Sequence, residues 1–152
     1  CRLSEIDNNG VAVIFWTYDN VKKINLNNHI VYSHDGGESF GKAIDTGVKA
    51  QASNLLWLDQ NIILTIHSHR ESPSGLILRK VNIENDKFEI LSELDLFKND
   101  DMVSDSSNIS KQFGSLKFGQ PSLVKLQNDE IIATCWCYEN NQHIIKSFIV
   151  NI

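Results

Sequence analysis

A stretch of 19 residues occurs three times in this chain, and this repeat constrains the fold more than any other feature. Residues 1–19, 52–70 and 121–139 align without a gap. Each copy has an apolar run, a turn at Asn or Asp, and a second apolar run that opens at Val11, Ile62 or Ile131. Apolar runs separated by such turns are typical of β-hairpins. The repeat therefore predicts one supersecondary unit that is used three times.

Further short runs of β-branched and aromatic residues follow each copy of the repeat. They predict third strands at 29–33, 75–81 and 143–150, and fourth strands near 41–45 and 88–94. Both prolines, Pro73 and Pro121, fall outside the interiors of these runs. We therefore predict an all-β fold that is built from four-stranded antiparallel sheets.

The end of the second strand carries the same residue types in all three copies. Rings occupy two alternate positions, as in Trp136 and Tyr138, and a small polar or thiol side chain separates them. Side chains alternate between the two faces of a strand. We therefore expect Trp136 and Tyr138 to share one face, and Cys135 and Cys137 to share the other. Two cysteines in these positions are not normally bridged, so we expect free thiols.

Charge and hydropathy exclude two classes of partner. The net charge is −5 and no basic stripe is present, so nucleic-acid binding has no electrostatic support. No apolar run approaches the roughly 18 residues that a membrane helix needs. The chain begins at Cys1 without a signal segment, and we expect it to be a piece of a longer protein.

The segment 33–40, Ser-His-Asp-Gly-Gly-Glu-Ser-Phe, lies between the third and fourth strands of the first copy. Ser33 opens the segment, and Asp35 can accept hydrogen bonds from backbone N–H groups of a tight turn. Gly37 can adopt a positive φ, and Phe40 can pack back on the sheet. We predict that this segment is a structural turn.

The segment 33–40 resembles the Asp-box, or BNR, repeat of sialidases, with Ser39 in place of Thr and Phe40 in place of Trp. Residues 119–139 are similar to the last blade of bacterial sialidase-like proteins. The resemblance implies about three blades of a likely six-bladed β-propeller. The blades would span 1–47, 52–95 and 119–152 of a partial propeller over 1–152, with an inserted surface loop at 96–117. It also implies that Asp35 is a fold determinant and not a catalytic residue.

Connections between the second and third strands, and between the fourth strand and the next blade, lie at one end of such a meander. The resemblance implies that this end holds the pocket, with Arg70 binding the sugar carboxylate, Tyr138 as nucleophile and Glu71 as its base. A planar guanidinium suits a carboxylate, and a phenol needs a neighbouring base. Two structural alternatives stay open. Arg70 can form a rim salt bridge with Glu71, and Tyr138 can be a packing ring.

Further side chains at the same end are candidates for substrate binding. They are Tyr18, Asp19, His69, Gln120 and Glu139. His67 and His69 lie two apart on one strand and could bind a metal, but no third ligand is apparent, so we expect no metal and no cofactor.

The resemblance implies a sialidase-like glycoside hydrolase that acts on terminal acidic sugars or related glycans. The alternative is a non-catalytic propeller that binds glycan or protein. The expected partner is a carbohydrate, with no nucleic acid and no membrane. Self-association through open sheet edges is a further expectation, including closure as a dimer. A cytoplasmic or a secreted bacterial protein fits the resemblance, and free cysteines favour the cytoplasm.

Overall fold

The computed structural model describes residues 1–105 and 107–151, and it shows an all-β protein. The predicted all-β class is confirmed. The strands are β1 (Arg2–Ile6), β2 (Gly10–Phe15), β3 (Tyr18–Asp19), β4 (Ile24–Asn25), β5 (His29–Ser33), β6 (Ile44–Asp45), β7 (Ala52–Asp59), β8 (Ile62–His69), β9 (Gly75–Asn82), β10 (Glu89–Lys98), β11 (Phe118–Lys125), β12 (Ile131–Glu139) and β13 (Gln142–Val150). The helical segments are the 3-10 helix η1 (Asp100–Met102) and α1 (Ile109–Gly114).

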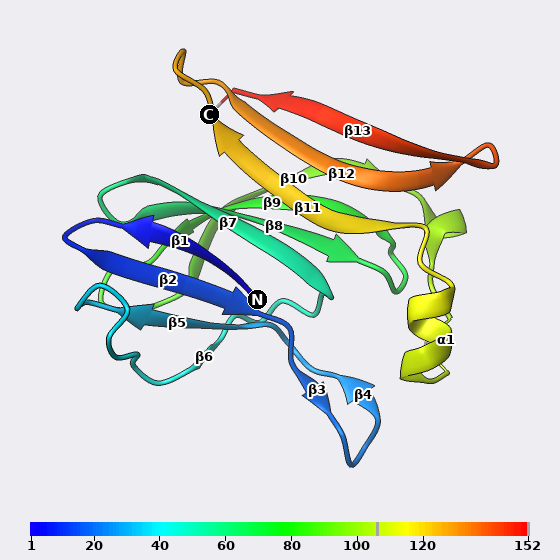
Figure 1. Cartoon of the computed structure of the whole chain (residues 1–152), viewed down its shortest axis with the longest axis horizontal. Helices are drawn as coiled ribbons and strands as arrows, with labels where there is room; N and C mark the ends of the chain where they lie inside the picture. The colour runs from blue at the N-terminus through cyan, green and yellow to red at the C-terminus, as the bar shows by residue number, and fades with distance from the viewer. Residues whose placement is uncertain (106, 152) are drawn as a thin grey trace.

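Three antiparallel sheets form the body of the molecule (Figure 1). The first sheet has the order β1-β2-β5-β6, the second β10-β9-β8-β7 and the third β11-β12-β13. A separate two-stranded sheet pairs β3 with β4. Each copy of the sequence repeat forms the first two strands of one sheet, and the predicted third strands follow as β5, β9 and β13. None of these sheets closes on itself within the described residues.

The first strands of the three sheets are neighbours. The Trp57 backbone N–H of β7 donates to Ser4 Oγ of β1 at 3.3 Å. On the other side of β7, Asn54 Nδ2 donates to the Pro121 carbonyl of β11 at 3.1 Å. Figure 1 shows the sheets fanning outward from this contact. The second sheet therefore lies between the other two.

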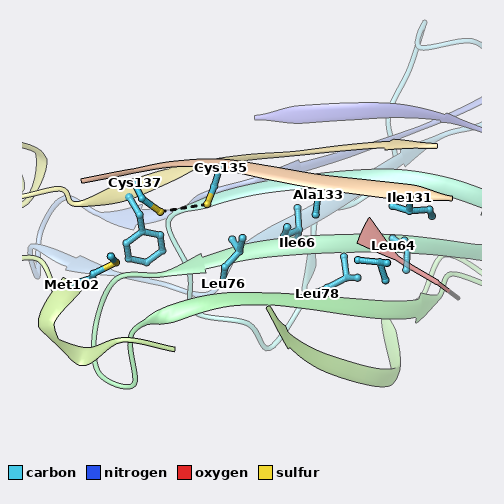
Figure 2. Packing of buried hydrophobic residues seen from close by; sticks show 11 residues of the cluster. Leu64, Ile66, Leu76, Leu78, Met102, Ile131, Ala133, Cys135 and Cys137 are labelled. Carbon is cyan, nitrogen blue, oxygen red and sulfur yellow. Dashed lines mark hydrogen bonds between the residues drawn. The ribbon is translucent and has the colours of Figure 1, made fainter. Parts of the chain in front are cut away.

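Alternation along the strands of the second sheet supplies two separate cores. One face packs against the first sheet in a cluster of Ala12, Ile14, Ile30, Tyr32, Leu55, Ile63, Val81 and Ile83. The opposite face packs against the third sheet, where Leu64, Ile66 and Leu76 meet Ala133 and Cys135 (Figure 2). Burial of apolar surface on both faces is the main stabilising contribution to this arrangement.

Cys135 and Cys137 share one face of β12, as the alternation predicts. This face lies against the second core, and both residues are buried free thiols. Their sulfur atoms lie 3.7 Å apart (Figure 2). Burial is the main reason that the pKa of Cys135 rises to about 12. Both side chains therefore act as small apolar groups in the packing.

The segment 96–117 differs from the predicted surface loop. Strand β10 continues to Lys98, and η1 and α1 follow it. Met102 is buried in the core between the second and third sheets, and Ser104 and Gln112 are also buried. The Ser104 N–H donates to the Arg70 carbonyl at 2.9 Å. The polar composition predicted a surface loop. Instead, the buried Met102 side chain and the hydrogen bond from Ser104 hold this part of the chain against the sheets.

The segment 33–40 forms a hydrogen-bonded turn between β5 and β6. Asp35 accepts the Ser39 N–H at 2.9 Å, the Ser39 hydroxyl at 2.6 Å and the Ser33 hydroxyl at 2.7 Å. Gly36 and Gly37 have φ values of 75° and 92°. Phe40 remains 46% exposed, so it packs back on the sheet only in part.

We predict that this turn contributes to the acid dependence of stability. Hydrogen bonds from Ser39, and then from Ser33, lower the pKa of Asp35 below its usual range. The unfolded value is about 3.9, so the contribution is present above roughly pH 4 and is lost as the pH falls toward the folded value. Asp35→Asn should therefore make the fall in Tm below roughly pH 4 less steep. Thermal melts between roughly pH 2 and 7 test this.

The matched control is Asp59→Asn. Asp59 is the last residue of β7 and is exposed, and its side chain accepts no hydrogen bond among the described residues. An acid limb that is equally steep in Asp35→Asn and in the unmodified protein would contradict the prediction.

The outward faces of the first and third sheets expose large apolar side chains. Leu3 is 67% exposed, Ile145 72% and Ile149 67%. None of the helical segments in residues 1–105 and 107–151 has the length and apolar character to cross a bilayer.

Candidate functional site

The two ends of the sheets are built differently. At one end, the Gly36 N–H of the β5–β6 turn donates to the Asn9 carbonyl of the β1–β2 turn at 2.9 Å. The expected grouping of these two turns at one end is therefore confirmed. The other end carries the connections that follow β2, β6, β8 and β10, and the candidate site lies there.

Arg70 is the central side chain of this end. It follows β8, is only 6% exposed, and donates from Nη1 to Gln51 Oε1 at 3.1 Å. Its Nε has no partner, and no carboxylate forms an ion pair with it among the residues that the structure describes. Burial lowers the pKa of Arg70 to about 10, so the guanidinium is still charged at neutral pH. A buried charge without a counterion is costly, and an anion is the group that would balance it.

The alternative of a salt bridge between Arg70 and Glu71 is not realised, because Glu71 has another partner. Lys49 Nζ donates to Glu71 Oε2 at 2.8 Å, and Asn25 Nδ2 lies 3.4 Å from Oε1. Burial opposes ionisation of Glu71, but the hydrogen bonds from Lys49 and Asn25 outweigh it and lower the pKa of the carboxyl. The glutamate is therefore a poor proton acceptor at neutral pH.

A β-bulge in β11 forms the opposite wall. The register between β11 and β12 shifts between Gly119 and Ser122, and Gln120 has a φ of 43°. An ideal Cβ on Gly119 would lie 2.0 Å from Arg70 Nη2. The guanidinium occupies this space because the residue is glycine. Bulges often redirect side chains beside functional sites, and this one places Gln120 at the cavity.

Aromatic side chains line, together with Arg70, a cavity of about 210 Å³, which we call the Arg70 cavity. Its lining residues are Trp16, Gln51, Ala52, Arg70, Phe113, Leu116, Gln120 and Trp136. Phe113 of α1 stands edge-on to the Trp16 ring, with centroids 6.2 Å apart. The cavity therefore combines flat apolar rings with one cation and two amides, a composition that suits small polar ligands.

The described part of the chain contains no group of three or more His, Cys, Asp or Glu side chains that could hold a metal ion. His67 is fully buried, and its Nδ1 lies 3.1 Å from Ser53 Oγ and 3.3 Å from Asn28 Nδ2. Burial is the largest cause that lowers the pKa of His67, so the ring is neutral. This histidine belongs to a polar network between the first and second sheets.

No family model and no curated protein matches this chain. Its structure is similar to the crystal structure of a protein of unknown function from Dyadobacter fermentans, with a TM-score of 0.65 and 17% sequence identity. The match covers 97% of this chain and 36% of the other chain. The chain therefore shares a fold with about a third of that longer protein.

Four predicted site residues lie at or beside the Arg70 cavity. Gln120 lines it, and Arg70 and Glu71 line an adjoining hollow of about 160 Å³. His69 lines the same hollow, but its ring also faces Arg79 Nη1 at 3.2 Å. Burial and then the charge of Arg79 lower the pKa of His69 to about 4, so this ring is neutral as well.

The other predicted site residues lie elsewhere. Tyr138 is on the outward face of the third sheet, 38% exposed, with its ring 4.9 Å from that of His143. Glu139 forms an ion pair with Lys146. Asp19 accepts the backbone N–H groups of its own turn at 2.8 and 2.9 Å. Tyr18 lines a further hollow beside α1. The structure does not bring Tyr138 and Glu139 to Arg70.

Sequence reasoning missed Trp16, Trp136, Gln51 and Phe113. The repeat did place a ring at Trp16 and Trp136, two positions before Tyr18 and Tyr138. No sequence signal pointed to Phe113, because its segment was interpreted as a surface loop.

Proposed function

We propose that the three sheets are blades of a β-propeller and that the Arg70 cavity binds a terminal acidic sugar of a glycan. Support for the propeller comes from the neighbouring first strands β1, β7 and β11 and from the matching strand order. Leu3, Ile145 and Ile149 lie on the two outer faces, where further blades of a ring would cover them.

The observation that carries the binding proposal is the Arg70 guanidinium, which is buried, has no carboxylate partner among the described residues and lies among aromatic rings. A sugar carboxylate would supply the missing negative charge through charge-assisted hydrogen bonds. Trp16 and Trp136 offer flat surfaces for the apolar face of a sugar ring. Gln51 and Gln120 add amide groups that can hydrogen-bond to sugar hydroxyls.

The geometry favours binding over hydrolysis. A tyrosine nucleophile needs a base within hydrogen-bond reach. Tyr138 lies outside the cavity, Glu71 is held by Lys49, and Glu139 is held by Lys146. Within residues 1–105 and 107–151, the cavity has a carboxylate-binding group but no assembled nucleophile and base.

Sialidase-type hydrolysis is the second candidate function. It is favoured by the position of Glu71 directly after Arg70, at the hollow that adjoins the cavity. This chain covers 36% of the similar structure, so hydrolysis would use a nucleophile and an acid from a larger protein.

Arg70→Lys tests the binding proposal. Lysine keeps the charge but loses the planar fork, so we expect the affinity for sialic acid to fall by roughly 10-fold to 100-fold. Isothermal titration of the protein with sialic acid measures this. Arg79→Lys is the matched control, because it makes the same exchange at a buried arginine that pairs with Glu93 and does not line the cavity.

Unchanged affinity in Arg70→Lys, or no binding to the unmodified protein, would refute the proposal. Turnover of a fluorogenic sialoside by the unmodified protein would establish the second candidate instead.

A further inference from the structure

The hollows at this end of the sheets adjoin one another through shared lining residues, and we call the three together the cleft. Arg70 and Gln51 line both the Arg70 cavity and the adjoining hollow of about 160 Å³. Asn25 and Glu71 line that hollow and also a third one of about 180 Å³. The cleft therefore runs from the third sheet, past Arg70, to the small sheet of β3 and β4 beside α1.

The third hollow has the composition of a polar binding site. Tyr18 and Lys23 of the β3–β4 hairpin line one side, and Gln112 and Asn108 at α1 line the other. Tyr18 supplies a flat ring, and Lys23 forms no ion pair among the described residues. An aromatic ring beside hydrogen-bonding groups is suited to a sugar unit.

Gln112 is the side chain that points to a ligand. It is 2% exposed, and its Oε1 accepts from Asn25 Nδ2 at a long 3.4 Å. Its Nε2 has no hydrogen-bond partner among the described residues. A buried amide donor without a partner is unfavourable unless another group accepts its hydrogen bond.

We infer that the hollow between the β3–β4 hairpin and α1 is a second sugar subsite, and that the cleft takes an acidic oligosaccharide of at least two units. The inference rests on the proposed function, since the terminal acidic unit occupies the Arg70 cavity. The next unit lies against Tyr18 and accepts a hydrogen bond from Gln112. The segment 99–117, through α1, therefore selects for ligand length.

Comparison of sialic acid with the trisaccharide sialyllactose tests the second subsite. We expect the unmodified protein to bind the trisaccharide about tenfold more tightly, from one ring contact and one or two hydrogen bonds. Tyr18→Ala should remove this difference by weakening trisaccharide binding alone. Tyr18→Phe keeps the ring and should retain most of it. Isothermal titration measures both ligands, and thermal melts verify that each variant is folded.

Val21→Ala is the matched control, because Val21 lies in the same hairpin, is 91% exposed and does not line the hollow. Equal affinities for the two ligands in the unmodified protein would overturn the inference while leaving the proposed function intact. A folded Tyr18→Ala variant that binds the trisaccharide as tightly as the unmodified protein would also overturn the inference. Failure to bind either ligand would refute the proposed function itself, and the inference with it.

Discussion

Replacement of Phe118 with alanine is expected to lower the free energy of unfolding by about 3–5 kcal/mol. Phe118 opens β11, is fully buried between the second and third sheets, and stands edge-on to Phe97 with ring centroids 5.3 Å apart. Deletion of the ring would leave a cavity that the pairing of β11 with β12 helps to hold open. Urea denaturation measures the loss as a lower midpoint with an unchanged slope.

Phe40→Ala is the matched control, since it removes the same ring from a side chain that is 46% exposed. We expect a loss of about 1 kcal/mol or less there. If Phe118→Ala cost no more than this control, the third sheet would not be packed on the second as the structure describes.

Replacement of Gly119 with alanine is expected to displace Arg70 and to weaken sialic acid binding by about tenfold or more. The added Cβ would lie 2.0 Å from Arg70 Nη2 and 3.1 Å from Cζ, so the guanidinium has to move. Its contact with Gln51 at 3.1 Å would be lost as it moves. Overpacking typically costs about 1–3 kcal/mol of stability, so thermal melts should accompany the titration.

Gly114→Ala is the control for this change, because an ideal Cβ at the end of α1 has no atom within 4 Å. Its stability and affinity should match those of the unmodified protein. Normal binding by a folded Gly119→Ala variant would mean that Arg70 does not need its position against β11 to hold the ligand.

The sequence by itself determined the local structure of this protein. Strand length, turns and the side on which each side chain emerges depend on residues close together in the chain. For that reason the 19-residue repeat predicted the hairpins β1–β2, β7–β8 and β11–β12, and alternation predicted that Cys135 and Cys137 share one face of their strand. The Asp35 turn was equally readable, because its hydrogen bonds join residues at most four apart.

Only the tertiary structure decided which side chains meet at the candidate site. Arg70 was identified from the sequence, but its lack of a carboxylate partner depends on Lys49 holding Glu71 and on Gly119 of another sheet. The cavity acquires Trp16 and Phe113 from segments that are nearly 100 residues apart in the chain. Local periodicity carries no information about such contacts, because the packing of the sheets and of segment 99–117 creates them. The same packing separates Tyr138 from the cavity, although the resemblance to sialidases implied that it belongs to the site.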